Sequence, residues 1–421
     1  MINGLFDFIK NSPTAFQAVG NVAIMLERAG YVRLYEDEMS TLNEGGKYYF
    51  LRNGTSLIAF SLPKSPVGFM ISATHSDSPS FRLKLGEERS GVYTRLDVEK
   101  YGGMIYYSWL DRPLSLAGRV LVNTECGIES VNVNIDRDLV TVPSVAIHLN
   151  RGVNDGYKFN PATDLLPLYR VGEGKHILDL VAEASGVARD SIASHDLFLY
   201  NREEPKRIGA EGELILSPRL DDLECVYSSL IGFLNATPTA SVPVFAIFDN
   251  EEVGSATKQG ADSDFLEATL KRIAGDRYYA MLENSFMVSA DNAHALHPNH
   301  PELSDAQNAP VLGRGIVVKF NASQRYATDG ISSAVFTRIC NNCGVKVQTY
   351  YNRADLPGGG TLGSIADTRV SVPTVDIGLC QLAMHSATET ASVSDFYGMV
   401  SALTAFFSTS ILRHGEKIEI K

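Results

Sequence analysis

The stretch VPVFAIFDNEEVGS (residues 242–255) carries the clearest signal for the fold of this chain. Residues 242–248 are apolar without alternation, which is typical of a β-strand that is covered on both faces. Two adjacent carboxylates, Glu251 and Glu252, follow shortly after the predicted strand. Enzymes with an α/β fold hold functional groups at the carboxyl ends of strands, although acidic residues there also commonly cap a helix or face water. The stretch therefore predicts an α/β fold and a pair of glutamates whose role depends on their partners.

Two other apolar runs lead into residues that can bind a metal ion. Residues 67–71 are followed by His75 and Asp77, which alternation along an extended chain would point in the same direction. A metal-binding imidazole is usually oriented by a carboxylate or a carbonyl, so this pair suits a metal site. Residues 374–378 form the second run and lead to His385. Either histidine could equally be a hydrogen-bonded loop residue, because each signal is weak alone.

Two further segments contribute aspartates. Asp221 and Asp222 open a stretch in which apolar residues recur at close to helical spacing through residue 233. The simplest interpretation of one of these aspartates is a helix N-cap. Asp291 precedes residues 294–300, which hold three of the nine histidines of the chain. Both segments can supply the carboxylates that a metal site needs.

Taken together, these groups match the requirements of a site for two divalent metal ions. Two ions held about 3.5–4 Å apart need a bridging carboxylate, histidine and carboxylate ligands on each ion, and a free carboxylate that acts as a base. The segments described above contain every one of these groups. Imidazole and carboxylate ligands without thiolates favour zinc, with Co²⁺ or Mn²⁺ as possible substitutes.

Five segments, in this order along the chain, resemble motifs of the M18 family of dizinc aminopeptidases, often called aspartyl aminopeptidases. They are THSDSPSFRLK (74–84), SPRLDDL (217–223), DNEEVGS (249–255), SADNAHALHPNHPE (289–302) and LAMHSATE (382–389). The resemblance spans most of the chain and implies an α/β fold with a three-layer catalytic domain of zinc-peptidase type. It also implies the activity of the family, which removes N-terminal amino acids from peptides.

The resemblance implies a role for each candidate metal ligand. Asp221 would bridge two Zn²⁺ ions. His75 and Asp291 would complete the first site, whereas Glu252 and His385 would complete the second.

Three other residues receive roles from the same resemblance. Glu251 would be the general base that takes a proton from metal-bound water, and such a carboxylate can return the proton to the departing amine. Asp77 would hold its metal site in register. His148 lies in a segment, residues 146–151, that resembles the family loop whose histidine reaches into the active site of a neighbouring subunit. It could instead form an ordinary hydrogen bond within its own chain.

Substrate preference depends on one candidate residue. Residues 318–326 resemble a substrate-pocket segment, in which Lys319 could bind an acidic side chain. A preference for N-terminal Asp or Glu follows, with Arg325 as a further cation to test. A surface location of Lys319 and a family member that prefers neutral residues such as Leu both remain as alternatives.

The pattern of predicted secondary structure changes in the part of the chain between the candidate ligands His75 and Asp221. Residues 85–212 contain short alternating stretches, many turns and little helical periodicity, which is typical of a mostly β domain. We expect this domain to be inserted into a catalytic domain formed by residues 1–84 and 213–421. In the M18 family such an insertion mediates dimerisation, and the dimers assemble into a tetrahedral dodecamer. The resemblance therefore implies a homo-oligomer of this kind.

Composition limits the classes of partner. The chain has 421 residues, 44% of them hydrophobic, so it can bury a large core. A net charge of −12 argues against nucleic-acid binding. No apolar run is long enough for a membrane span, and the N-terminus lacks the pattern of a signal peptide, so we expect a cytoplasmic protein. The odd count of five cysteines argues against a disulfide framework.

Two other functions compete with a metalloaminopeptidase. A glycosidase could use Glu251 and Glu252 as its acid and base, but adjacent residues rarely place their carboxyl groups about 5 Å or more apart across one glycosidic bond. A non-catalytic assembly protein could keep the metal ligands only for stability. The combination of ligands, base and family motifs favours the peptidase, which would act on peptide substrates.

Overall fold

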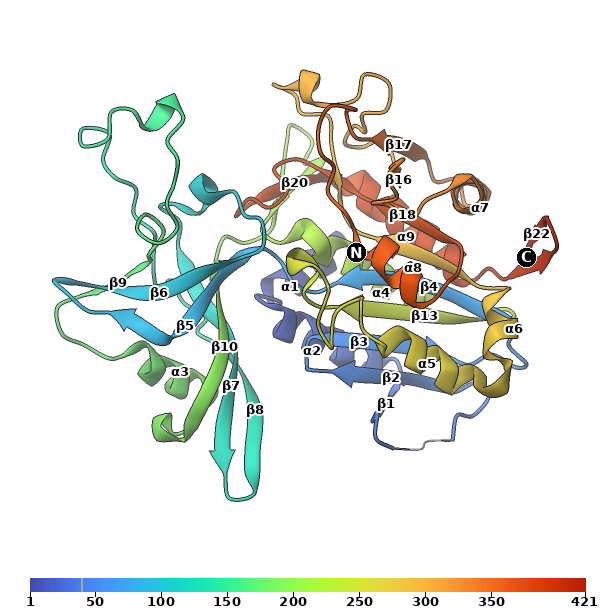
Figure 1. Ribbon diagram of the computed structural model, residues 1–421, viewed down its shortest axis with the longest axis horizontal. Helices are drawn as coiled ribbons and strands as arrows, with labels where there is room; N and C mark the ends of the chain where they lie inside the picture. The colour runs from blue at the N-terminus through green and yellow to red at the C-terminus, as the bar shows by residue number, and fades with distance from the viewer. Residues whose placement is uncertain (39–40) are drawn as a thin grey trace.

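The computed structural model describes residues 1–38 and 41–421, which are organised around two large β-sheets (Figure 1). The larger sheet has nine strands in the order β1 (Val32–Leu34), β2 (Lys47–Arg52), β3 (Ser56–Ser61), β13 (Ser241–Phe248), β4 (Gly68–His75), β14 (Phe286–Ala290), β18 (Thr374–Gly378), β16 (Ile316–Phe320) and β17 (Val347–Tyr351). Strands β13, β4, β14 and β18 run parallel to one another. All eight residues of β13 are buried, as the apolar run predicted.

Helices cover both faces of this sheet. Along β13, Phe245 and Ile247 pack into one core, whereas Val244 and Ala246 pack into the other, because successive side chains point to opposite faces. The first core is completed by α1 (Ile2–Lys10), α2 (Ala15–Arg28), α4 (Leu220–Asn235), α7 (Gly330–Asn342) and α9 (Val393–Phe407). The second is completed by α5 (Phe265–Ala274), α6 (Tyr278–Leu282) and α8 (Leu362–Arg369). These three layers confirm the predicted α/β fold.

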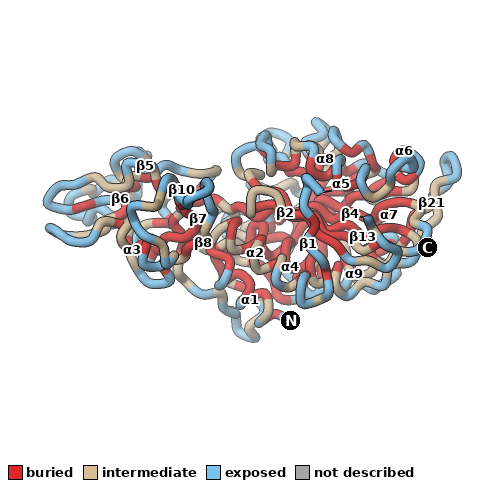
Figure 2. Tube along the Cα trace, turned by 90° about the horizontal axis from the view of Figure 1, so that it is seen from below, coloured by how far each residue is buried: buried red, intermediate tan, exposed pale blue. Residues whose placement is uncertain are grey.

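The second large sheet is antiparallel and has a core of its own. Its six strands lie in the order β8 (Gly127–Asn134), β7 (Leu114–Thr124), β10 (Ile192–Asn201), β5 (Ser80–Arg89), β6 (Tyr93–Tyr101) and β9 (Leu168–Val171), with α3 (Ile177–Ser185) packed beside it. The chain leaves the nine-stranded sheet after β4 and returns to it at β13 (Figure 1). Viewed from below, this sheet forms an arm beside the larger part of the molecule (Figure 2). The domain limits at residues 85 and 212 stay a prediction.

Smaller elements complete the fold. They are the sheet of β11 (Lys206–Ile208), β12 (Leu214–Ser217) and β20 (Glu389–Ser392), the pair β15 (Ala293–His294) and β19 (Cys380–Gln381), and the hairpin of β21 (Ile411–His414) and β22 (Lys417–Ile420). The five cysteines are free thiols. Within the described residues, none of the helices combines the length and apolarity that crossing a membrane requires.

Candidate active site

Three neighbouring parallel strands deliver candidate ligands to one edge of the nine-stranded sheet. His75 is the last residue of β4, and Phe248, the last residue of β13, is its partner in register. Glu251 and Glu252 therefore emerge beside His75. On the other side of β4, Asp291 follows the last residue of β14. Parallel strands share a carboxyl edge, which is where open α/β sheets bind their ligands.

Two further segments bring the remaining ligands to this edge. Asp221 and Asp222 lie at the start of α4, where the backbone is not yet helical. They are therefore not ordinary helix caps, and both side chains are buried. His385 lies in the connection between β19 and β20, with a left-handed backbone (φ 66°). A left-handed conformation is uncommon for a residue other than glycine and is found where the surroundings impose it.

The structure assembles these side chains into two groups that share Asp221. In the first group, His75 Nε2 lies 3.4 Å from Asp221 Oδ1 and 3.9 Å from Asp291 Oδ1. In the second group, His385 Nε2 lies 3.5 Å from Asp221 Oδ2 and 3.4 Å from Glu252 Oε2. The two oxygens of Asp221 thus face different histidines. One carboxylate can therefore contribute a ligand to each of two ions.

The donor atoms fit zinc in number, type and spacing. Tetrahedral zinc with bonds of about 2.0–2.2 Å to nitrogen and oxygen places neighbouring donors roughly 3.3–3.6 Å apart. Three of the four separations within the groups fall in this range. Asp221 Oδ1, Asp222 Oδ1 and Glu252 Oε1 are also buried without a hydrogen-bond partner. Buried polar atoms without partners are costly, and a cation would satisfy them.

Both histidines are oriented to present the same nitrogen. His75 Nδ1 lies 3.1 Å from the carbonyl oxygen of Asp77, and His385 Nδ1 lies 2.9 Å from the carbonyl oxygen of Gly103. A proton on each Nδ1, donated to the carbonyl, leaves the Nε2 lone pair free for a metal ion. Burial lowers the pKa of both imidazoles, but the surrounding carboxylates, including Asp222 beside His75, outweigh burial and raise it. This cluster of carboxylates therefore favours the binding of cations between the two histidines.

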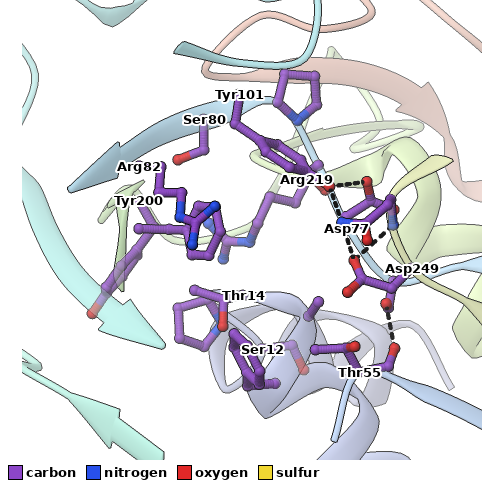
Figure 3. A pocket seen from close by; sticks show the side chains of 18 of the residues that line it. Ser12, Thr14, Thr55, Asp77, Ser80, Arg82, Tyr101, Tyr200, Arg219 and Asp249 are labelled. Carbon is purple, nitrogen blue, oxygen red and sulfur yellow. Dashed lines mark hydrogen bonds between the residues drawn. The ribbon is translucent and has the colours of Figure 1, made fainter. Parts of the chain in front are cut away.

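Asp77 links the two glutamates to the first histidine. Its carboxylate accepts hydrogen bonds from the backbone N–H groups of Glu251 (3.1 Å) and Glu252 (3.2 Å). It also accepts one from the hydroxyl of Tyr101 (2.6 Å), as Figure 3 shows. The same carboxylate lies 3.4 Å from His75 Nδ1. Asp77 therefore holds the strand end of β4 and the turn after β13 in a fixed relation, as an orienting residue should.

Glu389 holds two ligands of the groups from the opposite side. One of its oxygens accepts a hydrogen bond from the backbone N–H of His385 (2.8 Å), and the other accepts one from the backbone N–H of Asp221 (3.1 Å). Burial, followed by the charge of Asp221, raises the pKa of Glu389 to about 8. In the sequence, Glu389 is the last residue of the motif LAMHSATE, and no role was predicted for it. A carboxylate four residues after a candidate ligand was the available signal.

Tyr101 and Asp222 also lie in the candidate site, although the sequence predicted a functional role for neither of them. Tyr101 comes from β6 of the other large sheet, so nothing near it in the sequence indicates contact with Asp77. Asp222 joins the first group of possible ligands, although its Oδ2 already accepts the backbone N–H of His75 (3.1 Å). Burial and the charges of Asp291 and Asp221 raise the pKa of Asp222, with His75 opposing them.

Glu251 differs from Glu252 in its contacts. The Glu252 carboxylate faces His385, whereas that of Glu251 makes no hydrogen bond or ion pair with any residue that the structure describes. Burial raises the pKa of Glu251 to about 8, and the carboxylates of Asp291 and Asp77 add to this effect against the opposing influence of His75. Glu251 is therefore a basic carboxylate that lies beside the first group of ligands without belonging to it.

The model of the family of aminopeptidase I zinc metalloproteases (M18) matches residues 8–407. The chain belongs to the M18 family. It is a zinc-dependent aminopeptidase, a peptide hydrolase, and the glycosidase and non-catalytic alternatives are set aside.

Relatives agree with this membership over nearly the whole chain. The probable M18 family aminopeptidase 2 of Clostridium acetobutylicum is 40% identical over 422 residues, covering 96% of this chain and 98% of that protein. A solved structure of the Ape4 and Nbr1 complex aligns with a TM-score of 0.93 at 34% identity, covering 96% of this chain and 85% of that one. The mApe1 dodecamer of S. cerevisiae aligns with a TM-score of 0.85 at 27% identity, covering 96% and 95%.

Lys319 lies inside this M18 fold and not on its surface. Its ammonium group donates hydrogen bonds to the carbonyl oxygens of Asp291 (2.8 Å) and Asn292 (3.2 Å), and it lies 3.5 Å from Asp291 Oδ2. These three contacts match the three donors of an ammonium group. Burial lowers the pKa of Lys319, but Asp291 and Tyr326 raise it by more, so that the pKa lies above its ordinary value. Its nearest acidic partner is therefore a candidate metal ligand.

His148 lies apart from the two groups of ligands. It belongs to an exposed turn in the six-stranded part of the chain, next to exposed Val145, Ile147 and Leu149. The structure shows no hydrogen bond or ion pair between its side chain and any described residue, so the alternative of an ordinary internal hydrogen bond finds no support. A role in catalysis requires a second copy of the chain.

Proposed function

We propose that the two groups hold one zinc ion each, and that Glu251 is the general base of the hydrolysis. The main support for this proposal is the orientation of the Asp221 carboxylate, in which one oxygen faces His75 and the other faces His385. Zinc, when bound, would supply a Lewis acid for the peptide carbonyl and lower the pKa of water. Co²⁺ or Mn²⁺ can substitute where the same nitrogen and oxygen donors bind them.

The protein contributes proton transfer through Glu251. The Glu251 carboxylate lies near the ligands without a hydrogen-bond or ion-pair partner among the described residues, so it is free to accept a proton. We expect it to take a proton from the attacking water and to return that proton to the departing amine. Asp77 positions its backbone through the Glu251 N–H.

The two glutamates give a matched test. Glu251→Gln should keep two zinc ions per subunit by atomic absorption, while kcat on an aspartyl anilide falls by about 10²–10⁴-fold. Glu252→Gln, which changes the neighbouring residue in the same way, should lose zinc from the second site. Normal turnover by Glu251→Gln, or loss of zinc from it, would reject this division of roles.

We also propose a preference for Asp or Glu at the N-terminus of the substrate. The exposed Arg325 supports it as a cation that is open to a substrate, whereas Lys319 in the same segment is buried beside Asp291. A guanidinium or ammonium group favours a carboxylate side chain. A preference for a neutral residue such as Leu is the alternative, and kinetics on Asp, Glu and Leu anilides separate the two.

Finally, we propose that the chain assembles with copies of itself, as dimers within a tetrahedral dodecamer, and that His148 acts in a neighbouring subunit. Clustered apolar side chains on a surface commonly mark an interface, and the turn of His148 carries Val145, Ile147 and Leu149, the last 83% exposed. The mApe1 relative is itself a dodecamer. Leu149→Asp should reduce the assembly seen by size-exclusion chromatography with light scattering, whereas Leu303→Asp, at another exposed leucine, should not. An unchanged assembly in Leu149→Asp contradicts the interface.

A further inference from the structure

A cavity of about 520 Å³ lies between the two large sheets, behind the candidate metal ligands. Its walls come from the connection between α1 and α2, the turn between β2 and β3, strands β5 and β10, and residues 249–259. Asp77 and Asp221 line it, but Glu251, Glu252 and the two metal-facing histidines do not. The cavity therefore adjoins the proposed metal site at Asp77, Asp221 and Glu389, whereas the proposed base Glu251 is outside its lining.

Arg219 enters this cavity without an anionic partner. In Figure 3 its side chain extends into the cavity toward Tyr200 and Arg82. Its guanidinium donates to the carbonyl oxygens of Ile9 (3.0 Å) and Asn201 (3.4 Å), while Nε is buried with no hydrogen-bond partner. Across the described chain, no carboxylate lies within ion-pair distance of it. A buried unpaired charge is costly, so an anion that entered the cavity would be bound favourably.

Positive charge is in excess at this end of the cavity. Arg82 and Arg119 both pair with Asp196, at 2.7 Å and 2.8 Å. Arg82 and Arg119 therefore share one carboxylate, and Arg219 is a third guanidinium group that forms no ion pair with any described residue. Asp77 and Asp249 lie on another wall, and Asp221 and Glu389 also line the cavity. These four carboxylates disfavour a ligand that is negative throughout.

Aromatic side chains form much of the remaining wall. They are Phe16, Tyr101, Trp109, Phe198 and Tyr200, and the Arg219 guanidinium lies 5.7 Å from the centre of the Tyr200 ring. Pockets for small molecules typically combine such apolar walls with a few polar groups that fix orientation. We propose that this cavity binds a small organic carboxylate, with its charged group on Arg219 and its apolar part against the aromatic wall. A carboxylate suits one unpaired guanidinium through two parallel hydrogen bonds.

The chain supplies its own reporter for this site. Trp109 is the only tryptophan of the sequence, and it lines the cavity. We expect titration of the zinc-loaded protein with 4-methylpentanoate to change its tryptophan fluorescence in a saturable way. The amide 4-methylpentanamide, which has the same shape without the charge, and inorganic phosphate, which has the charge without the apolar part, should give no saturable change. Equal binding of the amide or of phosphate would overturn the assignment.

Substitutions of opposite expected sign locate the binding. Arg219→Gln should lower the affinity for 4-methylpentanoate by roughly 10- to 100-fold, the range expected for the loss of a hydrogen bond to a charged group. Asp196→Asn, which releases Arg82 and Arg119 from their shared carboxylate, should raise the affinity for 4-methylpentanoate. Arg189→Gln, at an arginine whose side chain is 45% exposed and paired with Asp179, is the control and should leave affinity unchanged.

These variants also distinguish the cavity from the zinc ions. A carboxylate bound to zinc would keep its affinity in Arg219→Gln, and that result contradicts the proposal. If Arg219→Gln does not fold, Asp196→Asn decides, since unchanged or weaker binding by that variant rejects the role of the arginine cluster.

Discussion

The carboxyl edge of the nine-stranded sheet and the exposed turn around His148 are organised in opposite ways. At the edge, groups of the same chain orient the ligands, with Asp77 and Glu389 holding them from two sides. At the turn, apolar side chains face outward and His148 has no partner within the described chain. One subunit thus supplies all the ligands of the proposed metal sites, whereas the proposed contribution of His148 depends on assembly.

The strongest test of the self-sufficient edge is removal of its shared ligand. Asp221→Asn should empty both metal sites, because one carboxylate serves both groups. Activity should fall toward the uncatalysed rate, a loss of at least roughly 10⁶-fold. Zinc content by atomic absorption and hydrolysis of an aspartyl anilide measure the two effects, and chelation of the native protein should reproduce them reversibly. A variant that keeps both ions would contradict a shared ligand.

The second test addresses the turn. His148→Ala should lower kcat by about 10²–10³-fold, the usual cost of one donor that stabilises the transition state, without loss of zinc. Mixed assemblies of His148→Ala and Glu251→Gln subunits should then recover activity, because an intact Glu251 can meet an intact His148 from a neighbour. If mixing restores nothing, His148 does not act between subunits.

A smaller effect is expected where the edge is held indirectly. Glu389→Gln places an amide donor against a backbone N–H of Asp221 or His385, so zinc affinity should fall by about 10–100-fold. Glu183→Gln, at an exposed glutamate paired with Lys175, is the control. Competition with a fluorescent chelator measures both variants. Native zinc affinity in Glu389→Gln would mean that the backbone holds its ligands unaided.

The smallest effect concerns the buried and the exposed cation of the substrate segment. Arg325→Ala should lower kcat/KM for Asp and Glu anilides by roughly 10-fold and leave Leu anilide unchanged. Lys319→Ala should affect all three substrates together, because its ammonium contacts Asp291. A loss confined to acidic substrates in Lys319→Ala would instead place Lys319 in the substrate pocket, as the sequence analysis predicted.

Local patterns were sufficient for much of the fold and for the choice of candidate ligands. The apolar run before Glu251 predicted β13, and the polar residues after three such runs identified His75, Glu252 and His385 as candidates. These signals are local because a strand covered on both faces must be apolar throughout, and its carboxyl end is where polar residues can return. The family motifs then assigned roles that residue spacing alone left open.

Contacts between distant segments could not be read in the same way. Tyr101 reaches Asp77 from the other large sheet, and Glu389 orients Asp221 from 168 residues away. Lys319, predicted to meet a substrate, lies against Asp291 because β16 passes beside that edge. Burial and partnership depend on which surfaces the packed sheets enclose, and no local pattern encodes this.

By itself, the sequence determined the residue types, the strands that carry them and the family, because these depend on periodicity and on motifs a few residues long. Only the tertiary structure decided that Asp221 turns one oxygen toward each histidine and that Arg219 is left unpaired beside a cavity. Both facts depend on distances between segments that the chain brings together only after the two sheets have packed. The two adjacent glutamates are separated in the same way, since Glu252 meets His385 and Glu251 does not.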